Sequence, residues 1–312
     1  MTTAILTHGD HDGMVCAILL LRLHPEAGLE FDSDRTLARR LRDLAAAESP
    51  PGVVFVSDIP LGFDRHEPVR AALEALTTRG TVVCLFDHHR GWQDHPEVLR
   101  LFATACVTDD DGGTAAALIG SALLPGDTTA GFWLSVLSRR ERSPETATHF
   151  ALLTALQQRE NYGRSKDTLR ALAQESTIRP EWAALAEEHR AREARALAEA
   201  LATAETLTTA QGRRVGWLDR RGHGTRIFVG DQAMQAQGWD LVATVEARKV
   251  RLGGAHINQG VSLGFLRGPQ DVAGVRLQVA GHDSPVAVTP LGRGVSADSF
   301  LRAVRQLIVE KL

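Results

Sequence analysis

Three short apolar runs in the first 90 residues each end in acidic or histidine residues, and this feature constrains the fold most. The runs are Ala4–Thr7, Val53–Ser57 and Thr81–Phe86, and helical patterns at Met14–Leu23 and Pro68–Leu76 separate them. Apolar strands alternating with helices predict βαβ units and a mostly parallel, buried sheet. Ligand sites in such sheets lie at the carboxyl ends of the strands. We therefore expect the polar residues to meet at one edge.

The residues that follow the three runs have the chemistry of a metal site. They are His8, Asp10 and Asp12 after the first run, Asp58 after the second, and Asp87, His88 and His89 after the third. Carboxylates brought together repel one another unless a cation is present. Carboxylate and imidazole ligands without thiolates favour Mn²⁺, Mg²⁺ or Co²⁺. Two such ions about 3.5–4 Å apart suit in-line displacement at phosphorus. A single Asp at a strand end is usually a cap or turn residue, so the prediction depends on all three clusters together.

Composition excludes several other classes of protein. The chain has 312 residues, which predicts two domains, and its 44% hydrophobic and 23% charged residues are typical of a globular protein. A net charge of −3 gives no surplus for bulk binding of nucleic acid. Three unpaired cysteines argue against a disulfide framework. We find no signal-peptide pattern and no membrane span, so the expected location is the cytoplasm.

The remainder of the sequence predicts an α/β fold with two domains. Residues 112–208 have helical patterns, ending in a long stretch at Pro180–Leu207, and strand patterns follow from Arg214 onwards. We expect a catalytic domain over residues 1–180, with a mostly parallel sheet covered by helices on both faces. A helical linker over 181–210 and a smaller, mixed α/β domain over 211–312 complete the prediction, with the boundary near 205–213.

Three motifs resemble those of a known family. The segments THGDHDG at 7–13, VSD at 56–58 and FDHHR at 86–90 are similar to the first three motifs of the DHH phosphoesterase superfamily. The C-terminal part resembles its usual companion, the DHHA1 domain. The family includes RecJ-like exonucleases, nanoRNases, cyclic-dinucleotide phosphodiesterases, exopolyphosphatases and manganese pyrophosphatases. The resemblance implies two Mn²⁺ ions in a cleft between the domains, with Mg²⁺ or Co²⁺ as alternatives.

The resemblance also implies a role for each matching residue. The implied metal ligands are His8 and Asp10 at one ion, Asp12 and His88 at the other, and Asp58 bridging both, with Asp87 orienting a histidine or acting as a ligand. His89 resembles the histidine that faces the scissile phosphate. Arg90 is either a phosphate clamp or an exposed loop residue.

The sequence departs from the family pattern where a fourth acidic motif is expected. About fifty residues after the DHH triplet, the segment 156–163 contains no Asp. Glu160 or Asn161 substitutes for it, or one ion has a ligand fewer. The acidic run at 109–111 is interpreted as the start of a helix, with one Asp reaching the site as the alternative.

The C-terminal part departs further. The expected glycine-rich substrate loop is reduced to residues 279–285, in which Gly281 and His282 are the candidate substrate contacts. Val275, Leu277 and Val279 alternate with polar residues, which predicts a strand. The resemblance instead implies a helix before the histidine.

These features together predict a metal-dependent phosphodiesterase. The expected substrates are short oligonucleotides or linear and cyclic dinucleotides, since the chain has no further nucleic-acid-binding module and little aromatic surface for long single strands. Two alternatives stay open: hydrolysis of polyphosphate or another small phosphorylated compound, and a degenerate, non-catalytic nucleotide binder. A homodimer is also left open.

Overall fold

The computed structural model of the chain is an α/β protein with two sheets. It describes residues 2–62, 65–108, 113–138, 143–219, 221, 231–246, 249–254, 266, 268–281, 286–291 and 294–312. The chain forms two compact units, Met1–His189 and Arg190–Leu312. Each unit has its own sheet and its own hydrophobic core.

Unit 1 is built from a five-stranded sheet and surrounding helices. Its strands are β1 (Thr3–Thr7), β2 (Gly28–Phe31), β3 (Val53–Ser57), β4 (Val82–Asp87) and β5 (Thr104–Val107). Its helical segments are α1 (His11–Leu23), α2 (Leu37–Ala46), α3 (His66–Thr78), η1 (Arg90–Trp92), α4 (Pro96–Leu99), α5 (Ala115–Leu123), α6 (Thr128–Leu137), α7 (Pro144–Leu156), η2 (Arg159–Asn161), α8 (Tyr162–Gln174) and the first part of α9 (Pro180–Ala202).

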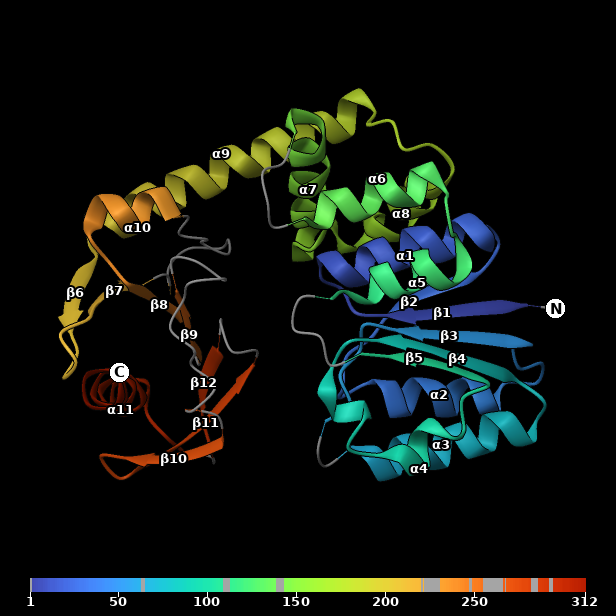
Figure 1. The fold of residues 1–312 in the computed structure, drawn as a ribbon, viewed down its shortest axis with the longest axis horizontal. Helices are drawn as coiled ribbons and strands as arrows, with labels where there is room; N and C mark the ends of the chain where they lie inside the picture. Colours follow the sequence, from blue (N-terminus) through green and yellow to red (C-terminus); the bar gives the residue numbers. More distant parts are fainter. Residues whose placement is uncertain are drawn as a thin grey trace. The chain divides into compact units, whose positions relative to one another are not determined.

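The sheet of unit 1 is parallel throughout, in the order β2-β1-β3-β4-β5. Alternate side chains point to opposite faces. Ile5 and Phe55 join the core under α1, and Leu6 joins the core under α2 and α3. Figure 1 shows these two helical layers on either side of the sheet. Because both faces are covered, the central strands β1, β3 and β4 are mostly apolar, as the sequence predicted.

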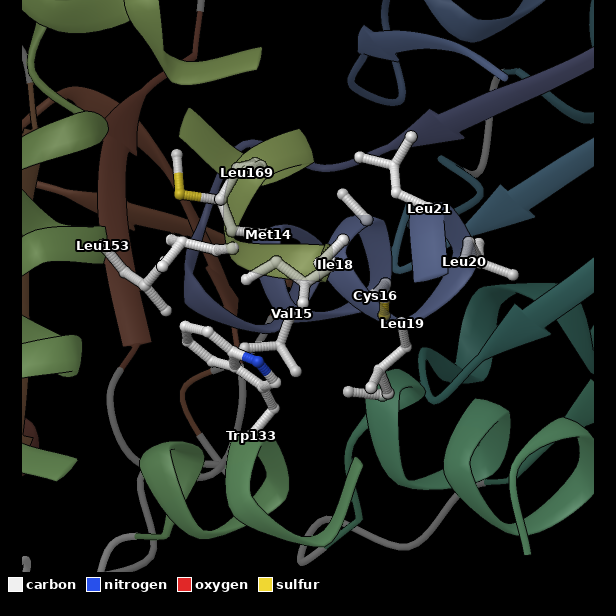
Figure 2. Close-up of a cluster of buried hydrophobic side chains, with 14 of the residues drawn as sticks. Met14, Val15, Cys16, Ile18, Leu19, Leu20, Leu21, Trp133, Leu153 and Leu169 are labelled. Atoms are coloured by element: carbon white, nitrogen blue, oxygen red, sulfur yellow. The ribbon is translucent and has the colours of Figure 1, made fainter. Parts of the chain in front are cut away.

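Helix α1 is the buried centre of this unit. All residues from Gly13 to Leu21 are buried, and Figure 2 shows Trp133 and Leu153 of neighbouring helices against them. A helix that is apolar all round needs a cover on every side. The sheet provides one cover and helices α5–α8 provide the other, which fixes the N-terminus of α1 at the sheet edge (Figure 1).

Unit 2 contains a seven-stranded mixed sheet. Its elements are the rest of α9, β6 (Glu205–Thr208), β7 (Arg214–Asp219), α10 (Asp231–Gln237), β8 (Leu241–Glu246), β9 (Lys249–Gly254), β10 (Gly268–Val272), β11 (Val275–Gly281), β12 (Val286–Pro290) and α11 (Ala297–Lys311). The strand order is β10-β11-β12-β9-β8-β7-β6, and the only parallel pair among the described strands is β7–β8. Phe300 and Leu307 of α11 pack on strands β7 to β12.

The predicted fold class is confirmed, with several local differences. Strands β1, β3 and β4 lie where the sequence predicted them, but β2, α2 and β5 were missed. Strands β2 and β5 have only four residues each, and α2 carries four charged residues among its ten. The helical pattern at Pro180–Leu207 ends at Ala202, and β6 follows it. The division between the units lies inside α9, between His189 and Arg190. The predicted linker over 181–210 covers α9 except its first residue, together with β6.

The alternation at Val275–Val279 forms strand β11, so the helix implied by the resemblance is wrong. The acidic run at 109–111 lies outside the described residues, as does His282. Within the described part of the chain, no helix combines the length and the apolar character that a membrane span requires.

Candidate metal centre

The register of the sheet aligns the ends of three strands. Thr7 is paired with Ser57, and Ser57 is paired with Phe86. The next residues in each strand, His8, Asp58 and Asp87, therefore begin side by side at the carboxyl edge. In the order 2-1-3-4-5 the chain changes direction between β1 and β3, and crevices at such switch points are where doubly wound sheets bind ligands.

The turn from β1 into α1 holds the first polar group. Asp10 is the N-cap of α1, and its Oδ1 accepts a hydrogen bond from the backbone N–H of Gly13 at 3.1 Å. Its other oxygen lies 3.0 Å from Nδ1 of His8. A Cβ added at Gly13 would lie 2.1 Å from the carbonyl oxygen of His8. Only glycine therefore allows this turn to close and bring His8 beside Asp10.

Asp12 is fixed by the beginning of another helix. Its Oδ2 accepts from the backbone N–H of Ala115 at 2.8 Å, and its Oδ1 accepts from that of Ala116 at 3.0 Å. These are the unpaired amides at the N-terminus of α5, where a carboxylate is favoured. Sequence reasoning did not identify this contact, although Thr114, the N-cap of α5 before a run of alanines, marks the start of that helix.

Asp58 has an unusual backbone conformation directly after β3. Its φ is 56°, in the left-handed region, and Ala273 is the only other described residue besides glycines with a positive φ. Its backbone N–H donates to the carbonyl of Phe86 at 3.1 Å. Such a conformation is costly for a residue with a side chain and persists only where the surroundings impose it. In Asp58 this backbone conformation points the buried carboxylate toward the centre of the polar cluster.

Asp87, at the end of β4, orients its neighbour His89. Its Oδ1 accepts from the backbone N–H of His89 at 2.6 Å and lies 2.9 Å from Nδ1 of the same residue. His88 Nε2 lies 3.3 Å from Asp58 Oδ1 and 3.6 Å from Asp12 Oδ2. The three strand ends thus form one continuous polar cluster, which we call the carboxylate cluster: His8, Asp10, Asp12, Asp58, Asp87, His88 and His89.

Two groups of potential ligand atoms lie within this cluster. His8, Asp10 and Asp58 form one group, and Asp58, His88 and His89 form the other, with the ligand atoms of each group within 4.8 Å of one another. Asp58 belongs to both. This is the arrangement that two neighbouring metal ions sharing one bridging carboxylate would need.

The electrostatics of the carboxylate cluster indicate missing positive charge. Burial, together with the negative charges of Asp10 and Asp12, holds the pKa of Asp58 well above its usual range. Burial raises the pKa of Asp12 to about 6 despite its two backbone hydrogen bonds. Burial would also raise the pKa of Asp10, but the hydrogen bond and the charge of His8 outweigh it and lower this pKa.

The donor atoms of the cluster fit divalent metal ions. Among the described residues, the buried atoms Oδ2 of Asp58 and Oδ2 of Asp87 have no hydrogen-bond partner, which is costly for a carboxylate unless another group compensates it. Within the described residues, no Lys or Arg forms an ion pair with Asp10, Asp12, Asp58 or Asp87. Oxygen and imidazole donors with no thiolate suit Mn²⁺ or Mg²⁺. The nearest thiol, that of Cys16, lies 4.0 Å from Asp12 Oδ1, and its pKa is raised by burial and by Asp12.

Other predicted site residues lie outside these two ligand groups. Glu160 is exposed in η2 and belongs to neither group. Asn161 is buried and donates from Nδ2 to the carbonyl of Ala155, so it supports the end of α7. Arg90 is exposed at the start of η1, directly after the cluster. Gly281 ends β11 in unit 2.

Comparisons with known proteins agree with this fold. No protein-family model matches the sequence, and no curated protein matches it. Solved structures that share its architecture include the following three. One is a DHH-domain protein described as a member of a family of ribosomal proteins, with 12% identity and a TM-score of 0.65, covering 99% of this chain and 86% of that one. The second is the pGpG-specific phosphodiesterase PggH from Vibrio cholerae, with 13% identity and a TM-score of 0.56, covering 98% of both chains.

The third structure is the exonuclease RecJ bound to manganese, with 13% identity and a TM-score of 0.54, covering 98% of this chain and 89% of that one. At such identities the likeness concerns the fold. It confirms that the chain has the architecture of DHH-domain proteins, as its three motifs predicted.

Proposed function

We propose that this chain, which has the fold of DHH-domain proteins, is a metal-dependent phosphodiesterase that hydrolyses short oligonucleotides or linear and cyclic dinucleotides in the cytoplasm. The observation that carries the proposal is the pair of ligand groups sharing Asp58 at the carboxyl ends of β1, β3 and β4. Their donor chemistry favours Mn²⁺, with Mg²⁺ or Co²⁺ as alternatives. Two of the similar structures are named as a phosphodiesterase and an exonuclease, which supports this reaction class.

The metal ligands in this proposal are those that the sequence motifs imply, and His89 is a further potential ligand because it belongs to the second ligand group. His8 and Asp10 would hold one ion, His88 the other, and Asp58 both. Asp12 is adjacent to His88 and fixed by α5, so it would complete the second site. When bound, a pair of divalent ions supplies an activated water and stabilises the leaving oxygen.

His89 is the residue of the cluster best placed to act on the phosphate. A carboxylate only accepts hydrogen bonds, so the 2.9 Å contact with Asp87 Oδ1 assigns the proton to Nδ1 of His89. This contact orients the imidazole ring and leaves Nε2 as the nitrogen available to the substrate. In its protonated form this nitrogen donates to a phosphate oxygen, and Asp87 stabilises the resulting charge. Arg90 follows at once and would add a second, exposed phosphate contact.

One observation favours a second candidate, a nucleotide-binding protein without turnover. Glu160, the proposed replacement for the missing fourth acid, lies in neither ligand group. A centre with too few ligands would hold one ion and bind a nucleotide without hydrolysing it.

An assay of several substrates with Mn²⁺ separates these functions. A dinucleotide, a five-residue oligonucleotide, a cyclic dinucleotide and polyphosphate are compared with the chain and with Asp87→Ala/His88→Ala. The proposal expects turnover of a nucleotide substrate that the double variant loses. Asp94→Ala/His95→Ala makes the same changes at an Asp-His pair outside both ligand groups and keeps turnover within about twofold. Turnover of polyphosphate alone, or of none of the four, would reject the proposed substrate class.

A further inference from the structure

An aromatic pair lies at the end of β2, directly beside the carboxylate cluster. Phe31, the last residue of β2, is paired with Thr7 of β1, and the backbone N–H of Asp32 donates to the carbonyl of Thr7 at 2.8 Å. Adjacent strands are about 4.8 Å apart. Phe31 is therefore one strand away from the turn that carries His8 and Asp10.

Phe31 also packs against that turn. A Cβ added at Gly9, between His8 and Asp10, would lie 3.9 Å from the Cβ of Phe31, an ordinary packing contact. Phe31 is 9% exposed. The ring of Tyr162 lies on it with a centroid separation of 5.6 Å and an interplanar angle of 57°. Tyr162 is thus connected to the candidate metal centre through one buried side chain.

Tyr162 itself is largely open to solvent. It is the only tyrosine of the chain, it begins α8, and it is 46% exposed. Within the described residues its hydroxyl has no hydrogen-bond partner, so no polar contact explains its position. Exposed aromatic rings held by a buried neighbour are the surfaces on which nucleobases stack in nucleic-acid-binding proteins.

Charged groups surround the ring. Arg40 Nε lies 3.3 Å from Asp32 Oδ2, Arg40 Nη2 lies 3.3 Å from Glu30 Oε2, and Lys166 Nζ lies 2.8 Å from Glu30 Oε1. Partial burial, Glu30 and Asp32 raise the pKa of Tyr162, and Arg40 opposes them, so all three lie near the phenol. The Asp32 side chain is buried, whereas that of Glu30 is partly exposed. A carboxylate such as that of Glu30 accepts hydrogen bonds from sugar hydroxyls and base amino groups.

We propose that the Tyr162 ring, supported by Phe31, stacks on a nucleobase of the substrate whose phosphate is held at the carboxylate cluster. This inference rests on the proposed function and narrows it. Tyr162 is then a specificity residue that selects phosphodiesters carrying a base over polyphosphate and other base-free compounds. Its hydroxyl is dispensable, because stacking uses the face of the ring.

The experiment compares Tyr162→Leu, which removes the ring, with Tyr162→Phe, which retains it. The probe is a dinucleotide containing 2-aminopurine, whose fluorescence is quenched when the base stacks, with a non-hydrolysable phosphonate linkage, titrated with Mn²⁺ present. The chain and Tyr162→Phe are expected to bind the dinucleotide and to quench its fluorescence. For Tyr162→Leu the dissociation constant is expected to rise about tenfold to a hundredfold, the range measured for loss of one stacked base. Because Tyr162 is exposed, both variants are expected to fold. Unchanged thermal unfolding temperatures check this.

An abasic dinucleotide with the same sugars and phosphate is the matched control ligand. Its binding is expected to be weak and equal in all three proteins. Three results would overturn the inference: an equal loss of affinity for both ligands in Tyr162→Leu, unchanged quenching in that variant, or no quenching in the chain itself. Turnover of the corresponding phosphodiester dinucleotide is measured separately, so that binding with stacking but without hydrolysis would reject the proposed reaction and retain this subsite.

Discussion

The two sheets of this chain differ in how they arrange the ends of their strands. In unit 1 every pair of strands is parallel, so all five carboxyl ends lie at one edge. In unit 2 neighbouring strands run in opposite directions except β7 and β8, so their carboxyl ends alternate between two edges. Both groups of potential metal ligands found among the described residues belong to unit 1.

This difference explains why the residues after each strand predicted a ligand site in unit 1 but not in unit 2. In a parallel sheet, polar residues that are distant in sequence are brought together by topology alone. In an antiparallel sheet the same residues would be divided between opposite edges. The proposed metal binding is therefore assigned to unit 1, and the following changes test that assignment.

Replacement of Asp58 by Asn should have the largest effect. Asn tolerates the left-handed backbone at this position, so the fold is retained while the shared carboxylate is lost. Turnover is expected to fall more than about a hundredfold, beyond the effect of losing a group that only supports a ligand. Asp271→Asn makes the same change at an exposed position of β10 in unit 2 and should leave the rate of hydrolysis unaltered. Comparable losses in the two variants would break the comparison.

Metal addition should stabilise unit 1 next most strongly. Binding to the folded state alone contributes about 2.7 kcal/mol at a hundredfold excess over the dissociation constant. Protein stripped with a chelator should therefore unfold several degrees higher in calorimetry after Mn²⁺ is added, while Asp58→Asn responds less. A metal-induced shift of the same size in Asp58→Asn would contradict the shared role of this carboxylate.

Two glycines allow the units to be perturbed separately. In Gly13→Ala the new Cβ would lie 2.1 Å from the carbonyl of His8, and in Gly216→Ala it would lie 2.3 Å from the ring of Trp239. Each change should destabilise its own unit by about 1–3 kcal/mol, as overpacking does. Only Gly13→Ala should weaken Mn²⁺ binding in a titration. Gly131→Ala, whose Cβ would meet no atom within 4 Å, is the helical control.

The smallest effect is expected from pH in the metal-free protein. Asp12 and Asp58 have pKa values raised above those of the unfolded chain, so the folded state binds more protons. Stability contributed by this protonation is present at low pH and is lost as pH rises through the folded pKa. Lowering the pH from 7.5 to 5.5 should raise the melting temperature by roughly 2–4 °C. Asp58→Asn should flatten this dependence, and a melting temperature that falls instead would show that the carboxylates are already compensated.

Much of the site was predictable because its residues follow strands that are themselves easy to recognise. Val53–Ser57 is a continuous apolar run, and the β3 strand has the same bounds. The chemistry of Asp58 and Asp87 then followed from their place at the strand ends. Short β2, with glycine and glutamate among its four residues, gave no such pattern, and the aromatic pair beside it was missed.

Other features depend on contacts between distant segments. Asp12 receives the amides of Ala115 and Ala116, more than a hundred residues away, and no local pattern encodes this pairing. The left-handed backbone of Asp58 is likewise imposed by its surroundings, since Asp seldom adopts it without help. Glu160 was proposed from its position along the chain; it lies in the exposed η2 turn and in neither ligand group, and its role stays a prediction.

The most direct test of the central claim is the number of Mn²⁺ ions bound per chain, measured by elemental analysis after stripped protein is dialysed against the metal. Two ligand groups joined by Asp58 predict two ions for the chain and at most one for Asp58→Asn. One ion or none in the unaltered chain, or two ions retained in the variant, would contradict a centre built around this carboxylate.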